Sequence, residues 1–157
     1  MGFKFTRYQD MSSTADLLNR LRYFVRTEAE TQFDALNRQW SRPLSERVAK
    51  GWAIEGLRVE RIQKGLIRLR CDTNDSRFRE GDLLVLHRGS PRNPNALHVE
   101  MQYDGETELE VSLIRGNSFF LEAEPTAWIV DQDWFDSSPY YLDALETVAD
   151  SLRGRSI

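Results

Sequence analysis

Apolar side chains recur at helical spacing in the first quarter of the chain. Four of them share one helical face: Leu17, Leu21, Phe24 and Val25. The pattern continues loosely towards Trp40, and Ser12 or Ser13 ahead of it is a residue type that caps helices. The pattern therefore predicts a helix over about residues 13–39.

Two shorter stretches also have helical character. After Pro43, residues 44–50 predict one short helix. Near the end, Ser138 can cap and Pro139 suits the first position of a helix over about residues 139–152. Its apolar stripe consists of Leu142, Leu145, Val148, Ala149 and Leu152. A helix with such a stripe needs a partner surface that covers it.

Between these helices the period of the apolar positions changes from 3.6 to two. Residues 97–103 alternate between apolar and polar side chains, and Asp104-Gly105 then predicts a hairpin turn. Lys64-Gly65 and Gly116-Asn117 are further turn signals. Gly56 lies where the apolar phase slips, which is typical of a β-bulge.

The alternating region contains six or seven short strands. The last two are predicted at residues 119–123 and 127–130, on either side of Pro125. Short strands with turns at this spacing are typical of an antiparallel barrel that is closed or nearly closed.

The order helix, barrel, helix predicts an α+β fold in which a small antiparallel β-barrel is inserted between two stalk helices. We expect a stalk helix and a short helix in residues 1–51, the barrel in residues 52–134, and the returning stalk helix in residues 135–157. Because each long helix has an apolar stripe to bury, the two helices are expected to pack together. The expected contacts include Leu17, Leu21, Leu145 and Val148.

Composition and charge narrow the possible functions. A chain of 157 residues fits one domain better than two, and its 40% hydrophobic residues indicate a folded chain instead of a disordered one. The net charge is −4, and residues 93–151 carry one arginine against thirteen Asp or Glu. Because nucleic-acid binders are normally basic overall, any contact with nucleic acid is expected to be local or shared with another domain.

The sequence also indicates a cellular compartment. Cys71 is the only cysteine, which excludes an internal disulfide and a cysteine-based metal site. No early apolar run resembles a signal peptide, and no stretch approaches the roughly 18 apolar residues of a membrane span. We therefore expect a cytoplasmic protein that does not enter a membrane.

Motifs for catalysis and cofactor binding are absent from the sequence. No phosphate loop of the form G-x-x-x-x-G-K-[ST], no G-x-S-x-G and no H-E-x-x-H occurs. The histidines are His87 and His98, and no third metal ligand follows from their spacing, so a structural or solvent-facing role is expected. We expect no enzymatic activity from this chain, no metal and no cofactor.

Acidic side chains alternate with apolar ones in the second half of the chain. Five of them stand out: Glu106, Glu108, Glu110, Glu122 and Glu124. Acid–base catalysis would need a sheltered carboxyl group with a shifted pKa, whereas alternation predicts a solvated strand face. Such a face limits edge-to-edge aggregation, and it can equally dock a basic surface of a partner protein.

Six arginines are the candidate nucleic-acid-binding residues. They lie on one predicted strand, in the loop after it and in the loop after the next strand: Arg68, Arg70, Arg77, Arg79, Arg88 and Arg92. Because the two strands are expected to be neighbours, the set predicts a single patch, and the alternative is scattered charge that serves solubility. Four aromatic residues are expected in the core instead of on a stacking surface: Trp52, Phe119, Trp128 and Trp134.

Several runs of residues resemble a known family. They are Pro43-Leu44-x-Glu46-Arg47, Gly51-x-Ala53-Ile54-x-Gly56-Leu57, Asn74-x-Ser76-Arg77-Phe78-Arg79-Glu80-Gly81-Asp82, and the ending Ala144-Leu145 with Asp150-Ser151-x-Arg153-Gly154-Arg155. Together they are similar to the segment before the ATPase core in bacterial superfamily 1B helicases. This branch includes the nonsense-mediated-decay helicase and the immunoglobulin mu-binding helicase. The resemblance covers most of residues 40–155.

The resemblance implies a non-catalytic N-terminal accessory domain of an ATP-dependent DNA or RNA helicase. In that branch a helical stalk carries a β-barrel before the first RecA-like domain, so the ATP-binding motifs would lie beyond Ile157. The implied partners are the RecA-like motor domains of the same parent protein and, weakly, single-stranded DNA or RNA. The alternative is a stand-alone protein-interaction module that uses the acidic barrel face.

Overall fold

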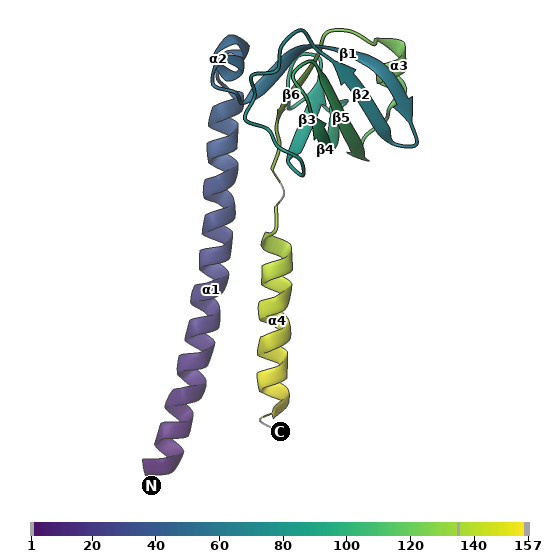
Figure 1. Ribbon diagram of the computed structural model, residues 1–157. Helices are drawn as coiled ribbons and strands as arrows, with labels where there is room; N and C mark the ends of the chain where they lie inside the picture. The colour runs from purple at the N-terminus through teal and green to yellow at the C-terminus, as the bar shows by residue number, and fades with distance from the viewer. Residues whose placement is uncertain (1, 135, 156–157) are drawn as a thin grey trace. The chain divides into compact units, whose positions relative to one another are not determined.

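The computed structural model describes residues 2–134 and 136–155, and it describes side chains for residues 13–134 and 136–153. The fold is α+β, with helices flanking a small closed antiparallel β-barrel, as predicted (Figure 1). The chain separates into two compact units. Met1–Asp34 and Asp136–Ile157 form the stalk unit, and Ala35–Phe135 form the barrel unit. The side chain of Arg155, part of the family resemblance, lies outside the described residues.

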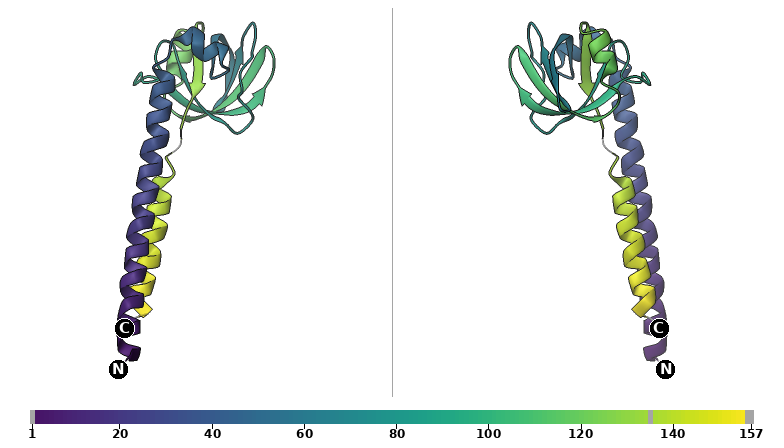
Figure 2. Two further views of the ribbon diagram at one scale, coloured as in Figure 1. Left: turned by 90° about the vertical axis from the view of Figure 1, so that its left-hand side faces the viewer. Right: turned by 90° about the vertical axis from the view of Figure 1, so that its right-hand side faces the viewer.

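Two long helices account for the stalk unit and run antiparallel beside each other (Figures 1 and 2). α1 spans Gly2–Trp40 and α4 spans Ser138–Arg155, while the short helix α2 spans Leu44–Ala49. The predicted start of α1 is wrong, because Ser13 lies inside the helix. Phe5, Tyr8 and Met11 recur three residues apart ahead of Ser13, a helical spacing that the prediction did not use. Among the described residues, no helix has the length and hydropathy needed to cross a membrane.

The apolar stripes of the stalk are only partly covered. Arg22 Nη2 on α1 lies 3.9 Å from Glu146 Oε1 on α4. Leu145, one of the predicted contact residues, is half-buried. The other three keep 40–57% of their surface exposed: Leu17, Leu21 and Val148. These three side chains therefore contribute little buried surface to the stalk unit.

Six strands close the barrel in the order β1-β2-β5-β4-β3-β6, and every neighbouring pair is antiparallel. They are β1 (Ala53–Gln63), β2 (Leu66–Arg70), β3 (Leu83–His87), β4 (Leu97–Asp104), β5 (Glu108–Arg115) and β6 (Trp128–Gln132). β1 pairs with both β2 and β6, which leaves no open sheet edge (Figure 2).

The glycines of the predicted turn and bulge have the backbone conformations that these features require. Lys64 and Gly65 join β1 to β2 with φ angles of 51° and 78°, as a tight hairpin turn needs. Gly56 has a φ angle of 67° and lies where the pairing of β1 with β6 shifts, between Ile54 and Leu57. The sequence signals for the hairpin and for the bulge are both confirmed.

One predicted strand is a helix. Phe119–Ala123 form the single-turn helix α3, so the strand predicted at residues 119–123 is wrong. Leu121 is fully buried, whereas Phe119 is 62% exposed and Phe120 is 36% exposed. The six strands already pair all around the barrel, so this segment has no strand to pair with. A single helical turn instead directs Leu121 into the core.

The core fills the inside of the barrel. Its largest fully buried side chains are aliphatic and come from five of the six strands: Leu57, Ile67, Leu69, Leu84, Leu86, Leu97, Met101 and Leu109. Phe78 from the β2–β3 connection and Leu121 from α3 complete the core. Trp128 is buried as predicted, but Phe119 is at the surface. Trp52 and Trp134 are half-buried.

Candidate nucleic-acid interface

Four arginines face one another across the β1–β2 hairpin. The pairing register sets Arg58 opposite Arg70 and Arg61 opposite Arg68. All four project outward, because Ile67 and Leu69, which alternate with the β2 arginines, are fully buried. We call Arg58, Arg61, Arg68 and Arg70 the basic face. Like charges directly opposite each other are unfavourable in a sheet, so this arrangement needs anionic partners.

Carboxylates of the barrel partly balance the basic face. Those within 3.5 Å of its guanidinium groups are Glu60, Asp72, Glu108 and Glu110. Arg68 on β2 pairs with two carboxylates of the neighbouring strand β5. Its Nε lies 2.9 Å from Glu108 Oε1, and its Nη2 lies 3.4 Å from Glu110 Oε2. The side chains of Arg58, Arg68 and Arg70 remain 43–51% exposed. Ion pairs this exposed contribute only about 0–1 kcal/mol, so another anion can compete for the guanidinium groups.

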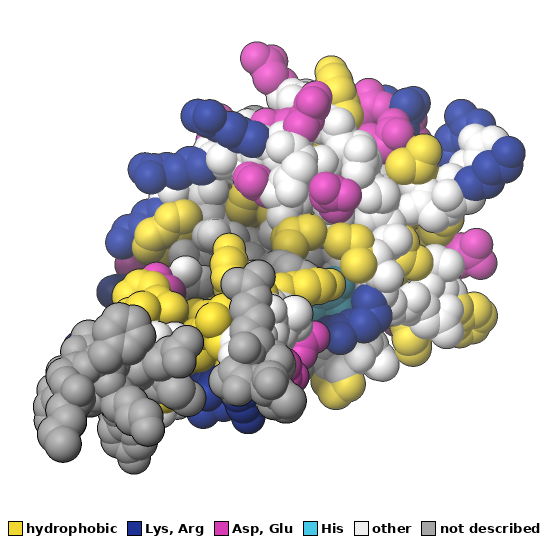
Figure 3. All heavy atoms as spheres, turned by 90° about the horizontal axis from the view of Figure 1, so that it is seen from below, with side chains coloured by type: hydrophobic (Ala, Val, Ile, Leu, Met, Phe, Trp, Pro, Cys, Tyr) yellow, Lys and Arg dark blue, Asp and Glu magenta, His cyan; other side chains and the backbone are white. Residues whose placement is uncertain are grey.

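The end of the hairpin is the least neutralised part of the basic face. Arg61 donates a hydrogen bond to Gln63 Oε1 and makes no ion pair among the described residues. Lys64 is exposed in the turn, and the two cations line a hollow of about 340 Å³ together with Leu66 and Arg68. In Figure 3, basic side chains project at the far right, where this hairpin ends in Figure 1.

The remaining predicted arginines do not join one patch with the basic face. β2 and β3 are not neighbours, because β5 and β4 lie between them on one side and β1 and β6 on the other. The prediction of neighbouring strands is therefore wrong. Arg77 and Arg79 precede β3, whereas Arg88 and Arg92 follow it, so the two loops meet β3 at its opposite ends. The spacing of the strands along the sequence does not reveal which strands pair when the barrel closes.

Arg88 and Arg92 hold parts of the barrel unit together. Arg92 Nη2 donates to Asn37 O, Asn37 Oδ1 and Ser41 Oγ at 3.0–3.2 Å, and its guanidinium lies 5.7 Å from the Trp40 ring centre. Arg88 pairs with Glu124 and donates to a backbone carbonyl at 3.0 Å. These two arginines have contacts within the fold that account for their positions.

Arg77 and Arg79 are exposed in the β2–β3 connection. Their backbone N–H groups donate to Gly51 O and to Asp82 Oδ2, at 2.9 and 2.8 Å. No hydrogen bond or ion pair is formed by their guanidinium groups within the described residues. They are exposed cations outside the basic face, at the other end of β3 from Arg88 and Arg92.

The five glutamates of the acidic half all reach the surface. Glu108 and Glu110 pair with Arg68, and Glu124 pairs with Arg88. In Figure 3, acidic and basic side chains mix over the visible part of the barrel. Three of the five glutamates therefore serve as counterions of arginines on a solvated surface.

A buried charged cluster that the sequence did not indicate links α2 to the barrel. Arg47 Nε donates to Asp131 Oδ1 at 2.8 Å, and His87 Nε2 lies 2.6 Å from Asp131 Oδ2. All three side chains are at most 6% exposed. The Gly89 N–H donates to His87 Nδ1 at 3.2 Å, so Nε2 carries the proton that is shared with Asp131. The only sequence signal was an aspartate that directly follows the apolar run of β6.

His98 is part of a second chain of polar contacts. Its Nδ1 lies 2.6 Å from Asp133 Oδ2, and Arg115 Nη2 donates to its Nε2 at 2.9 Å. Both ring nitrogens of His87 and of His98 thus have a hydrogen-bond partner, so neither histidine has a free nitrogen that could act as a general base. Burial, reinforced by the charge of Asp72, raises the pKa of the Cys71 thiol and keeps it unreactive. Among the described residues, no group of His, Cys, Asp and Glu could hold a metal ion.

Residues that carry the family resemblance hold the barrel together. Asn74 Nδ2 donates to Asp104 Oδ1 at 2.6 Å and to Gly105 O at 2.8 Å, which ties the β2–β3 connection to the β4–β5 turn. Phe78 from the same run is in the core, and Arg47 belongs to the buried charged cluster. These contacts give Arg47, Asn74 and Phe78 structural roles in the barrel unit.

Comparison with models of protein families found no match to this chain, and comparison with curated proteins found none either. The resemblance to superfamily 1B helicases thus rests on the motifs and on the order of the elements.

Proposed function

We propose that this chain is a non-catalytic accessory module of an ATP-dependent nucleic-acid helicase, and that its barrel contacts the phosphate backbone of a single strand through the basic face. The observation that carries this proposal is the two pairs of facing arginines on β1 and β2. Guanidinium groups form a planar fork that fits phosphate oxygens in a bidentate manner.

Facing arginines favour a bound anion for a simple electrostatic reason. Side chains directly opposite each other in a sheet have Cβ atoms about 5 Å apart, so their charges repel. A phosphate between two such guanidinium groups removes that repulsion, and a row of two pairs matches a chain of successive phosphates. The exposed carboxylates bind the arginines only weakly, so a phosphate can displace them.

The same carboxylates make weak binding the expected behaviour of the isolated module. A net charge of −4 opposes the approach of a polyanion, so firm binding would require the RecA-like motor domains of the parent helicase. ATP hydrolysis would also belong to those domains, since no phosphate-loop motif occurs in this chain. The alternative is recruitment of a basic partner by the acidic face, in which Glu108 and Glu110 would exchange Arg68 for a cation of that partner.

Titration of a fluorescent single-stranded oligonucleotide with the full chain at two salt concentrations tests the proposal. The double variant Arg61→Ala/Arg68→Ala should bind more weakly, and its log–log salt dependence should become less steep by about 0.7 per lost phosphate contact. Arg77→Ala/Arg79→Ala removes the same charge from a different loop and is the matched control. Equal effects of the two double variants, or no binding by the wild type at low salt, would refute the role of the basic face.

A further inference from the structure

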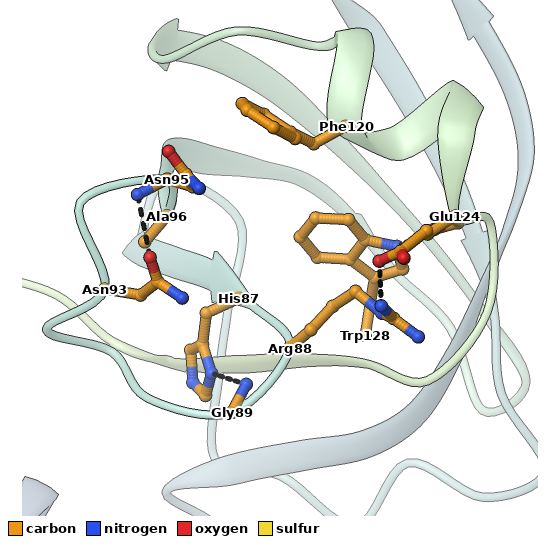
Figure 4. A pocket seen from close by; sticks show the side chains of 9 residues that line it. All are labelled: His87, Arg88, Gly89, Asn93, Asn95, Ala96, Phe120, Glu124 and Trp128. Carbon is orange, nitrogen blue, oxygen red and sulfur yellow. Dashed lines mark hydrogen bonds and ion pairs between the residues drawn. The ribbon is translucent and has the colours of Figure 1, made fainter.

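A hollow of about 230 Å³ opens beside the ends of β3 and β6. Its walls come from the β3–β4 connection, from α3 and from the start of β6 (Figure 4). None of the contacts proposed above for the phosphate backbone uses this hollow.

Aromatic rings form much of its wall. Figure 4 shows Phe120 from α3 above the indole of Trp128, with the His87 ring on another side of the hollow. Trp128 Nε1 donates to Glu124 O at 2.6 Å, so the polar edge of the indole is satisfied within the fold. Trp128 and His87 are buried in this wall, with 3% and 1% of their surface exposed, whereas Phe120 is 36% exposed. Phe120 is therefore the ring that is available for stacking against a flat aromatic ligand.

Unused amide groups add hydrogen-bonding capacity to these aromatic walls. Asn93 Oδ1 accepts the Asn95 N–H at 2.9 Å, which holds the loop in place (Figure 4). The Asn93 side-chain NH₂ and the whole Asn95 side-chain amide form no hydrogen bond within the described residues. Amide side chains offer both donors and acceptors, which is the chemistry that reads the edge of a nucleobase.

Strand directions bring this hollow to the same end of the barrel as the tip of the basic face. Neighbouring strands are all antiparallel, so β1 and β3, which lie on either side of β6, run in the same direction. β1 ends at Gln63 next to Lys64, and β3 ends at His87 in the hollow. A strand whose backbone crosses the basic face can therefore continue towards the hollow without passing to the other end of the barrel.

We propose that this hollow is a base pocket, which accepts one unstacked nucleobase of the strand whose backbone lies on the basic face. The inference rests on the proposed function and specifies how the strand is held: phosphates on the hairpin, and a base stacked on Phe120 in the hollow that Trp128 helps to line. Stacking tolerates every base, so such a pocket would strengthen the grip on a strand with little sequence preference.

Two oligonucleotides of equal length separate the two parts of this mechanism. One is a thymidine homopolymer, and the other has the same backbone with abasic sites throughout. At low salt, the full chain should bind the thymidine strand about tenfold more tightly than the abasic strand, as expected for one stacked base. Asn95→Ala and Phe120→Ala should each reduce this preference and leave the affinity for the abasic strand unchanged.

Phe119→Ala is the matched control, because Phe119 is the adjacent phenylalanine and does not line the hollow. Thermal unfolding checks the fold of Phe120→Ala, and the exposed Asn95 offers a second variant with little risk to folding. Equal binding of the two strands by the wild type would overturn the base pocket while leaving the proposed function standing. Equal losses from Phe119→Ala and Phe120→Ala would overturn it too. Absence of binding to both strands would overturn the proposed function, and the pocket with it.

Discussion

Asp131 has no exposed surface and lies between two basic side chains. Its carboxylate accepts hydrogen bonds from Arg47 Nε at 2.8 Å and from His87 Nε2 at 2.6 Å. Arg47 also donates to the carbonyl oxygens of Trp40 and Arg42, so one guanidinium joins the end of α1, α2 and β6. A buried charge is tolerated only when it is paired in this way.

Replacing Asp131 with alanine should therefore destabilise the barrel strongly. The change leaves the Arg47 guanidinium buried without its carboxylate, a situation that typically costs about 3–5 kcal/mol. Chemical denaturation followed by tryptophan fluorescence measures the loss. Glu60→Ala is the control, because it removes the exposed partner of Arg70 and should change stability by at most about 1 kcal/mol. Similar losses in the free energy of unfolding for the two variants would contradict the conclusion that burial makes the Asp131 contacts important.

At the level of elements, two glycines at the ends of β1 have the same backbone conformation in different surroundings. Gly51 precedes β1 and Gly65 follows it, and both have a φ angle of 78°. A Cβ atom added at Gly51 would lie 2.8 Å from Arg77 Cγ and 3.2 Å from Arg77 N. At Gly65 the same atom would meet nothing within 4 Å. Alanine substitutions at the two positions therefore separate the free-energy cost of backbone strain from that of close packing.

Gly65→Ala should cost only the strain of a left-handed residue, about 1–2 kcal/mol. Gly51→Ala should cost that amount and roughly 1–3 kcal/mol more, because the β2–β3 connection has to move away from β1. Denaturant midpoints of the two variants provide the comparison. Equal destabilisation would show that the approach of Arg77 to Gly51 is not tightly packed.

At the scale of the whole molecule, the core belongs to the barrel unit alone. Every residue of the buried core cluster lies between Ile54 and Val130. The stalk helices instead keep large apolar side chains exposed, among them Phe24 at 63% and Tyr140 at 70%. Because hydrophobic burial supplies most of the folding free energy, the barrel unit should not depend on the stalk unit for its stability.

A fragment of residues 35–135 should accordingly fold cooperatively. Its thermal midpoint should lie within about 8 °C of that of the full chain, which corresponds to about 1 kcal/mol for a domain of this size. A fragment of residues 43–135 is the control. It lacks Leu36, which is 7% exposed, and Trp40, whose Nε1 donates to Gln132 O at 2.9 Å, so it should be clearly less stable. Failure of the longer fragment to unfold cooperatively would refute the independence of the barrel.

Local signals in the sequence were sufficient for most of the elements. The helix pattern, the Lys64-Gly65 turn and the bulge at Gly56 depend on residues that are neighbours in the chain. Such preferences act over a few residues, and for this reason they can be recognised without a structure. The same approach failed at residues 119–123, where a closed barrel left no strand to pair with and a helical turn formed instead.

Most of the candidate site was decided by contacts between distant residues. Arg47 and Asp131 are 84 residues apart, and the opposition of Arg61 to Arg68 depends on a bulge that shifts the pairing register of β1. The hollow beside Trp128 needs three segments that meet only once the barrel has closed. By itself the sequence determined most of the elements, and the alternation of Arg68 and Arg70 with Ile67 and Leu69 determined that these two arginines face outward. Only the tertiary structure decided which charges face each other, because strand order and register follow from closing the barrel around its apolar core.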